Sequence, residues 1–198
     1  MTVHVHIWSD YVCPFCLITD ELVARAAAGR TDVEIEHHPH ELRPYPARTL
    51  RPEDPYLPGV WTSTVYPMAR RLGVPMALPT VSPQPRTELA FRGFRYASDR
   101  GVANAYHRRV LTAFFRDDLD IGDRGVLVRL AQDVGLDPAG FTAALDDPSY
   151  ARRHRDALAE AERLGITVVP TVFVGGRRLE GVVTENALHR AFDEVVAA

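Results

Sequence analysis

The sequence predicts an α/β protein in which a strand–helix–strand unit and a strand–strand–helix unit are separated by a long helical block. Three observations carry this prediction: alternating β-branched residues in VHVHIW and DVEIEHHPH, apolar residues three and four positions apart in successive segments after Thr87, and a return to strand and turn after Gly165. With 198 residues, of which 46 % are hydrophobic and 25 % charged, the chain has the composition of one globular domain, or of one domain with an insertion.

The first strand is expected at Val3 to Trp8, and a helix follows Cys13 because apolar residues recur there at helical spacing. A second strand is expected at Asp32 to His40, with Val33 and Ile35 on one face. A helix of this length between two strands implies that the strands are parallel and joined by a right-handed crossover.

Prolines crowd the segment from Arg43 to Pro85, which we expect to be irregular surface chain around a short helix from Thr62 to Leu72. Helical segments with apolar stripes follow, in TELAFRGFRYASDRG, VANAYHRRVLTAFFRD, GDRGVLVRLAQDVGLD and DPAGFTAALDDPSYARRHRDALAEAERLG. The stretch ITVVPTVFVGGRRLEGV returns to strand and turn. The last helix is expected in TENALHRAFDEVVAA, where Thr184 can cap it.

Composition narrows the class of function. A net charge of −3 gives little general attraction to phosphate backbones, and no segment interleaves aromatic and basic residues, so we expect no nucleic-acid partner. No apolar stretch reaches the roughly 18 residues that cross a bilayer. The start, MTVHVHIWSD, has neither a basic segment nor a small-residue cleavage site. We therefore expect a cytoplasmic protein without a membrane partner.

The two cysteines, Cys13 and Cys16, lie three positions apart where the first strand gives way to a helix. At a helix start this spacing puts Cβ atoms about 5 to 6 Å apart, close to what a disulfide accepts. Pro14 suits the first helical position, which leaves Cys13 near the N-cap, where free amides and the helix dipole favour a thiolate. We expect Cys13 to be the exposed nucleophile. Cys16 should be the less exposed thiol that resolves a mixed disulfide.

A second candidate feature is Pro170 in GITVVPTVF, which interrupts a β-like run. Proline in a strand removes a ladder donor and belongs at an edge, a bulge or a strand start. If the Val169–Pro170 bond is cis, it turns the chain sharply and leaves the backbone of Val169 free to pair with an extended substrate.

In this order of elements the chain resembles the DsbA family of thiol–disulfide oxidoreductases, most closely its cytosolic FrnE-like branch. The resemblance rests on IWSDYVCPFC, HPHELRP, AYHRRVLTAFFRDDLDIGD, LAQDVGLD and AERLGITVVPTVFVGGR. It implies a thioredoxin-like fold with an inserted all-helical subdomain. Residues 1–42 and 165–198 would form the discontinuous thioredoxin-like domain, and residues 43–164 the helical insertion with its Pro-rich loops.

The resemblance also implies roles for individual residues. Cys13 would attack and Cys16 would resolve, opposite a cis-proline loop. The residues that would contact substrate are Pro14, Phe15, Val169, Pro170 and Thr171. Two positions depart from the family pattern, which usually has a small residue in place of Val168 and often Trp or His in place of Phe15.

The resemblance implies no tightly bound cofactor beyond the redox-active Cys13–Cys16 disulfide, with a low-molecular-weight thiol as a candidate co-substrate. The chain has no third cysteine, so an external reductant or oxidant must exchange electrons with it. The substrate would be a disulfide-containing protein or a small molecule, and a homodimer is an open option. In a reducing cytosol the pair should rest mainly as a dithiol, which favours disulfide reduction or isomerisation over bulk oxidation.

Other interpretations remain for single residues. The cysteines could be small buried hydrophobes, or could form a zinc site with His37, His38 and His40. Strand alternation points neighbouring histidines in opposite directions, so we expect no metal at the cysteines. His4 and His6 are expected to be packed or hydrogen-bonded.

Asp10 is expected to cap the turn, with a role as a base or proton relay for the thiols as the alternative. Trp8 and Tyr11 are expected in the core rather than in a substrate groove. Two arginine pairs, Arg108 with Arg109 and Arg152 with Arg153, are expected on solvated surface.

Two other functions stay open. Kappa-class glutathione transferases and 2-hydroxychromene-2-carboxylate isomerases share the helical insertion, but typically have Ser where this chain has its Cys pair. A non-enzymatic chaperone-like or redox-sensing binding module is the third hypothesis.

Overall fold

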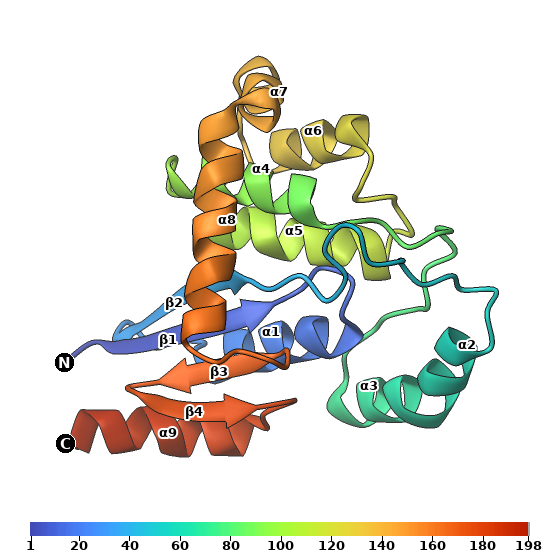
Figure 1. Cartoon of the computed structure of the whole chain (residues 1–198). Helices are drawn as coiled ribbons and strands as arrows, with labels where there is room; N and C mark the ends of the chain where they lie inside the picture. Colours follow the sequence, from blue (N-terminus) through green and yellow to red (C-terminus); the bar gives the residue numbers. More distant parts are fainter. Residues whose placement is uncertain (198) are drawn as a thin grey trace.

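One mixed four-stranded sheet forms the centre of the molecule, a computed structural model that describes residues 1–197 (Figure 1). Its strands are β1 (Val3–Ser9), β2 (Val33–Pro39), β3 (Thr171–Val174) and β4 (Arg177–Glu180), in the order β2-β1-β3-β4. The pair β1 and β2 is parallel, whereas β3 runs antiparallel to both β1 and β4. Helix α1 (Pro14–Ala26) connects the parallel strands, and α9 (Glu185–Ala197) follows β4. The predicted fold class is confirmed.

The two faces of β1 differ in chemistry because successive side chains point to opposite sides of a sheet. Val3, Val5 and Ile7 are buried in the main apolar core, together with buried side chains of α1 and α9. The other face carries His4, His6 and Trp8. The first two remain partly or fully exposed, and Trp8 is buried.

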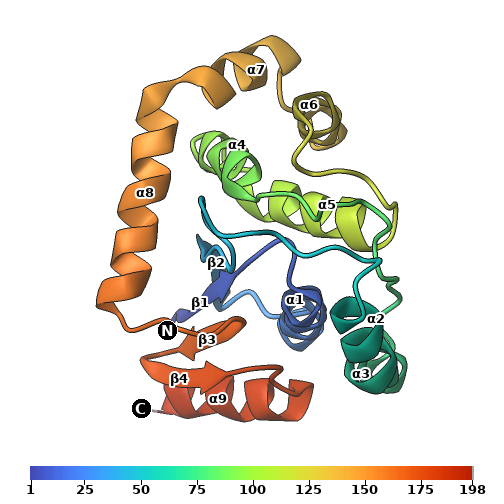
Figure 2. The same ribbon diagram turned by 45° about the vertical axis from the view of Figure 1, so that its right-hand side comes forward.

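The helical block consists of α4 (Glu88–Ser98), α5 (Ala103–Phe115), α6 (Arg124–Asp133), α7 (Pro138–Asp146) and α8 (Pro148–Arg163). Figures 1 and 2 show α4 to α7 above the sheet and α8 descending along one side to the loop before β3.

The last helical segment of the block is two helices, which corrects the prediction of one continuous segment from Asp137 to Gly165. The side chain of Asp147 accepts the Ser149 amide and caps α8. Pro148 starts α8 and has no N–H with which to continue α7.

The Pro-rich segment contains more helix than the sequence predicts. A helix begins at Tyr56 rather than Thr62 and comprises α2 (Tyr56–Val60), the π-helical turn η1 (Trp61–Val65) and α3 (Tyr66–Leu72). Pro58 lies in the first turn, where its missing N–H costs nothing. At Pro67 an α-helical turn would press the ring against a carbonyl one turn earlier, and the wider π turn just before it avoids this contact.

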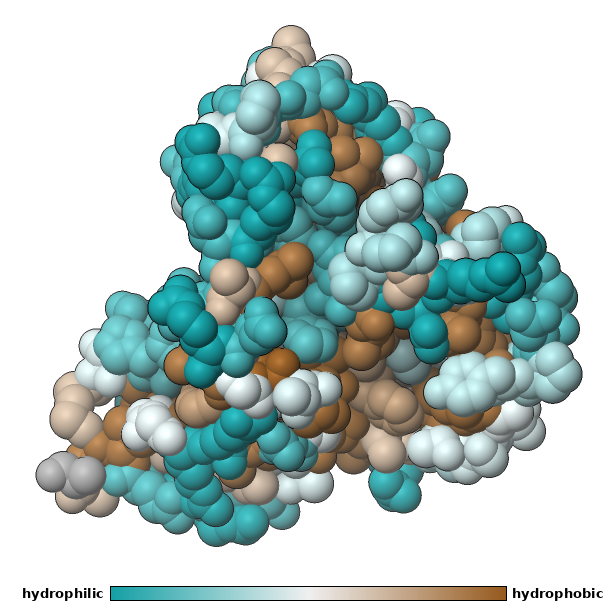
Figure 3. All heavy atoms as spheres, in the orientation of Figure 1, coloured by the Kyte–Doolittle hydropathy of each residue, from teal (hydrophilic) through white to brown (hydrophobic). Residues whose placement is uncertain are grey.

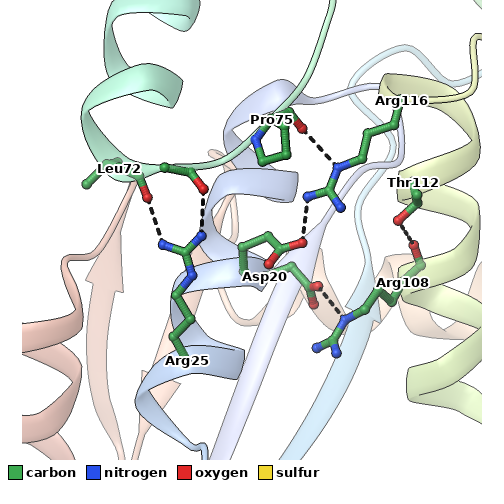
Figure 4. A network of polar contacts seen from close by, with 9 residues as sticks. Asp20, Arg25, Leu72, Pro75, Arg108, Thr112 and Arg116 are labelled. Carbon is green, nitrogen blue, oxygen red and sulfur yellow. Dashed lines mark hydrogen bonds and ion pairs between the residues drawn. The ribbon is translucent and has the colours of Figure 1, made fainter.

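Arginine side chains attach the end of α3 to the rest of the molecule (Figure 4). Arg25 of α1 donates to the carbonyl oxygens of Leu72 (2.7 Å) and Gly73 (2.8 Å). Arg116, just after α5, donates to the carbonyl of Pro75 (2.9 Å) and pairs with Glu21 of α1 (2.7 Å). The helical segment from α2 to α3 is therefore tied at its end to α1, the helix that begins at the cysteines.

Three of the four arginines predicted on solvated surface also form ion pairs. Arg108 contacts the buried carboxylate of Asp20 (3.4 Å). Arg109 bridges Asp117 and Asp133, at 2.7 and 2.8 Å. On α8, Arg153 binds Asp99.

The last helix begins as predicted, because the Ala187 amide donates to Thr184 Oγ1 (3.3 Å). Within residues 1–197, no helix has both the length and the apolar character needed to cross a membrane.

Candidate active site

Both cysteines lie at the start of α1, directly after the end of β1. Cys13 has an extended backbone (φ −92°, ψ 113°) at the N-cap position, and Pro14 is the first helical residue. The turn is closed by hydrogen bonds from the Cys13 amide to the Asp10 carbonyl (3.1 Å) and from the Cys16 amide to the Cys13 carbonyl (3.0 Å). Both cysteines are free thiols in this structure. The predicted placement of the pair is therefore correct.

The predicted exposure of Cys13 is wrong. Cys13 is only 4 % exposed and Cys16 only 2 %. Cys13 instead lies in the wall of a cavity of about 340 Å³. Sequence reasoning missed this because the opposite wall comes from chain far from α1.

The cavity is lined by the beginning of α1, by the Pro-rich segment and by the loop before β3. Its lining residues are Val12, Cys13, Pro14, Phe15, Leu42, Arg43, Thr49, Leu50, Tyr56, Leu57, Val60, Trp61, Gln84, Pro85 and Val169. Most of these side chains are apolar, and Figure 3 shows apolar surface gathered in the hollow between the sheet and the α2–α3 region. The sequence contains one indication of the distant wall. Leu57 and Trp61 are large apolar residues among the prolines, and such residues are expected to be buried rather than exposed in a loop.

The Val169–Pro170 loop faces Cys13, and its peptide bond is cis. Cys13 Sγ lies 3.8 Å from the Val169 carbonyl oxygen. Of the three loop residues expected to contact substrate, only Val169 lines the cavity. Pro170 is buried, and Thr171 turns inward, where its hydroxyl donates to the Val168 carbonyl (2.7 Å).

Trp8 lies in the core, as predicted, behind the thiols. It belongs to a small apolar cluster with Cys13, Cys16, Val169, Ala161 and Ile166. Its indole stacks on the His38 imidazole, with ring centres 4.4 Å apart and planes 16° apart. Tyr11 is also fully buried and stacks on Phe91.

Asp10 is a buried residue whose backbone carbonyl accepts the Cys13 amide and whose carboxyl group contacts the chain just before the Pro-rich segment. Its Oδ2 accepts the Leu42 amide at 2.7 Å, whereas Oδ1 has no hydrogen-bond partner among residues 1–197. Burial raises the pKa of Asp10 to about 6, partly offset by the Leu42 hydrogen bond. The predicted cap is made by the Asp10 backbone carbonyl rather than by its side chain.

Burial also raises the pKa of the Cys16 thiol well above its ordinary value, and the contact with the Cys13 side chain and the charge of Asp10 act in the same direction. Cys16 therefore holds its proton firmly, and a nearby group that accepts the proton would assist its reaction.

The structure does not bring the histidines of HHPH to the cysteines. His37 faces Asp20 and His107 on one side of β2, and His38 faces His6 and Glu36 on the other. Within residues 1–197, these two clusters are the groups of three metal-ligating side chains, and neither contains a cysteine. The zinc site considered for the Cys pair and HHPH is therefore not assembled.

Comparison with known proteins shows similarity over almost the entire chain. The family described as "DSBA-like thioredoxin domain" matches residues 4–193. A protein of Bacillus subtilis (strain 168), described as "Uncharacterized protein YwbO", is 42 % identical over 196 residues, which is 98 % of each chain.

Solved structures share the fold. A probable DsbA oxidoreductase, SCO1869, from Streptomyces coelicolor is 26 % identical, with a TM-score of 0.80 over 98 % of this chain and 90 % of the other. A 2-hydroxychromene-2-carboxylate isomerase is 16 % identical, with a TM-score of 0.77 over 98 % and 95 % of the two chains. The cytosolic disulfide reductase DsbM from Pseudomonas aeruginosa, in its structure with GSH, is 19 % identical, with a TM-score of 0.68 over 98 % and 96 %.

Proposed function

This chain belongs to the DSBA-like thioredoxin domain family, and from that premise we propose that it is a thiol–disulfide oxidoreductase that cycles Cys13 and Cys16 between dithiol and disulfide. One observation carries the proposal. The Cys13 thiol borders an apolar cavity opposite the Val169 carbonyl, and Cys16 lies within the same first turn of α1. We further propose the FrnE-like branch, with residues 1–42 and 165–198 as the thioredoxin-like domain around a helical insertion, residues 43–164.

The proposed reaction uses the two thiols, Asp10 as a proton acceptor and a disulfide-containing partner. Cys13, as thiolate, attacks one sulfur of a substrate disulfide, forms a mixed disulfide and displaces the other substrate sulfur as a thiolate. Cys16 gives its proton to Asp10 and attacks Cys13 Sγ, which releases the second substrate thiolate. The substrate gains two electrons and the chain is left with a Cys13–Cys16 disulfide. Two equivalents of an external monothiol such as glutathione then reduce that disulfide in two exchange steps, restore the dithiol and leave as their own disulfide.

The cavity suits an extended apolar segment or a small thiol as substrate. Its wall is mainly apolar, and Leu42 and Tyr56 in that wall are 46 % and 60 % exposed, with Tyr45 nearby in the chain 81 % exposed. Phe15 extends the apolar wall beside Cys13. The Val169 backbone adds the polar partner that an extended peptide can use.

Glutathione is the co-substrate that we propose to test first, since the fold neighbour DsbM is described in a structure with GSH. The description of DsbM as cytosolic also supports a cytoplasmic location and work in the reducing direction.

The proposal is tested by insulin reduction with glutathione as reductant. Cys13→Ser should abolish turnover, because the attacking sulfur is lost. Cys16→Ser should accumulate a covalent adduct with substrate, because the mixed disulfide is no longer resolved. Turnover by Cys13→Ser at the wild-type rate would refute the proposal.

The isomerase fold neighbour keeps one alternative function in view. An enzyme of that class uses a thiol cofactor in the cleft without cycling a dithiol, so Cys16→Ser would retain its activity. The same variant should lose multiple-turnover disulfide reduction. A binding module would instead keep its affinity for unfolded peptide in Cys13→Ser and show no turnover in any variant.

A further inference from the structure

A ladder of histidine and glutamate side chains follows the second face of the sheet, opposite the apolar core. In the parallel register His4 lies beside Glu34, His6 beside Glu36, and Trp8 beside His38. None of the histidines or glutamates in this ladder takes part in the reaction proposed for Cys13 and Cys16.

Three members of the ladder direct nitrogen and oxygen atoms at one point. His6 Nδ1 lies 3.0 Å from His38 Nε2 and 3.4 Å from Glu36 Oε2. His38 Nε2 lies 3.8 Å from Glu36 Oε1. The imidazole ring centres of His6 and His38 are 5.2 Å apart, and the ring planes differ by 38°.

These separations match those of ligands around a tetrahedral ion. With bonds of about 2.0 to 2.1 Å to nitrogen or oxygen, ligand atoms on one zinc ion lie about 3.3 Å from one another. Two imidazoles on such an ion have ring centres about 5 Å apart. The side chains of His6 and Glu36 are 38 % and 64 % exposed, so an ion can enter and keep water as a further ligand.

The second cluster, Asp20 with His37 and His107, fits an ion less well. Its two imidazoles stack face to face, with ring centres 3.8 Å apart, so their Nε2 atoms do not converge at a tetrahedral angle. Asp20 already pairs with Arg108, and all three members of the cluster are buried.

We propose that His6, Glu36 and His38 form a binding site for a divalent transition-metal ion of the zinc class, with a fourth position open to solvent. Two imidazoles and one carboxylate are ligands suited to Zn²⁺, Co²⁺ or Ni²⁺, and poorly suited to Mg²⁺ or Ca²⁺. The site shares His38 with the zinc site considered from the sequence but contains no cysteine, and no metal site was predicted from the sequence. The proposal of this metal site does not rest on the proposed oxidoreductase activity.

The site is linked to the thiols through one side chain. Trp8 stacks on the ligand His38 and packs in the apolar cluster of Cys13 and Cys16. An ion that fixes the His38 ring therefore also fixes the indole behind the cysteines.

Isothermal titration calorimetry with Zn²⁺ on the untagged full chain tests the proposal. Cys13→Ser/Cys16→Ser is the background for every variant, because free thiols also bind zinc. In this background we expect one Zn²⁺ per chain. His6→Gln and Glu36→Gln should each weaken the affinity at least about tenfold. Mg²⁺ should not compete.

Two control variants identify the site. His4→Gln removes a histidine of the same ladder that has a single glutamate partner, Glu34. His107→Gln removes a member of the buried cluster. Both should bind Zn²⁺ as the background does. Circular dichroism identifies any variant that fails to fold. If His6→Gln fails to fold, Glu36→Gln tests the metal site, because the Glu36 side chain is exposed.

The proposal is overturned if Zn²⁺ does not bind stoichiometrically, or if His6→Gln and Glu36→Gln leave the affinity unchanged. It is also overturned if His4→Gln weakens binding as much as they do, since surface histidines in general would then be responsible.

Discussion

The buried carboxyl group of Asp10 should lower the stability of the protein at neutral pH and assist the reaction of Cys16. Its pKa rises from about 3.8 in an unfolded chain to about 6 in the folded state. Below about pH 4 the group is protonated in both states, and its contribution to stability is fully present. That contribution is lost as the pH rises through about 6, because the folded chain must then ionise a buried group. Two pKa units correspond to about 3 kcal/mol.

Asp10→Asn should therefore become more stable relative to wild type as the pH rises. An amide carries no charge and can still accept the Leu42 hydrogen bond. We expect the free energy of unfolding of the variant, minus that of wild type, to increase by about 2 to 3 kcal/mol between about pH 4 and pH 7.5. Urea denaturation across this range measures it, and a difference that does not change with pH would contradict the burial argument.

The same variant should be a slower enzyme. Cys16 holds its proton firmly, and Asp10 is the proton acceptor proposed for it. In Asp10→Asn, we expect the first attack by Cys13 to proceed and the release of substrate from the mixed disulfide to slow. Quenched-flow measurement of adduct lifetime separates these steps. Asp99→Asn, a surface carboxylate bound to Arg153, is the control and should leave the lifetime unchanged.

Residue-level predictions succeeded where the cause is local. Pro14 and the i, i+3 spacing were sufficient to place Cys13 and Cys16 at a helix start. Burial of Cys13 depends on residues such as Leu50 and Trp61, which no local pattern connects to it. The inward turn of Thr171 depends on one hydrogen bond to Val168, which the sequence does not specify.

At the scale of elements, the helical block is packed most tightly where α4 crosses its neighbours. A Cβ atom added to Gly93 of α4 would lie 2.4 Å from the Tyr106 hydroxyl oxygen on α5 and 2.5 Å from Phe141 on α7. Neither ring has room to move, since both residues are fully buried. Glycine therefore sets the distance between these helices.

Gly93→Ala should destabilise the protein by about 1 to 3 kcal/mol, because overpacking outweighs the gain in helix propensity. Gly59→Ala is the matched control in α2, where an added Cβ meets no atom within 4 Å. That variant should gain about 0.5 to 1 kcal/mol. Thermal unfolding of both variants measures the contrast, and equal shifts in melting temperature would contradict the close contact at Gly93.

Helices and strands with a regular apolar period were predicted from the sequence, whereas the helix in the Pro-rich segment was predicted only in part. The helix between β1 and β2 is long enough for a crossover connection, and this predicted their parallel pairing. The start of α2 was missed because the crowded prolines before Thr62 predicted irregular chain, although the first turn of a helix tolerates Pro58. The division between α7 and α8 depends on the cap at Asp147.

On the scale of the whole molecule, access to Cys13 depends on how firmly the α2–α3 segment is held. Leu57, Val60 and Trp61 from this segment face Cys13 across the cavity. Arg25 and Arg116 hold the end of α3 through backbone carbonyls, and such hydrogen bonds from charged groups are stronger than neutral ones. Opening of the segment should therefore limit how fast a reagent reaches the thiol.

Arg25→Ala should raise the rate at which iodoacetamide alkylates Cys13 several-fold, because the cavity wall opens more often. Mass spectrometry over time measures the rate, and hydrogen exchange in residues 56–72 should increase in parallel. Arg163→Ala removes a surface arginine that pairs with Glu160 of its own helix and should change neither rate. Unchanged alkylation in Arg25→Ala would show that the segment does not control access.

Of the features of the candidate site, the arrangement of the cavity walls was predicted least well from the sequence. The order of elements and the cysteine motif were sufficient for the fold and for one wall of the cavity. The opposite wall joins Leu42, Tyr56 and Pro85, which are far apart in the chain. Contacts of that kind follow from tertiary packing and have no periodic signal.

The chain has two tryptophans, and they lie on either side of the reactive sulfur. Trp8 packs behind Cys13 and Cys16, and Trp61 lies in the cavity wall across from them. Disulfides quench indole emission at short range, so the intrinsic fluorescence of Trp8 should report the redox state of the pair without a dye. Trp61 should respond to whatever enters the cavity. With Trp61→Phe and Trp8→Phe, one spectrometer can therefore follow electron transfer and substrate entry as two separate optical signals.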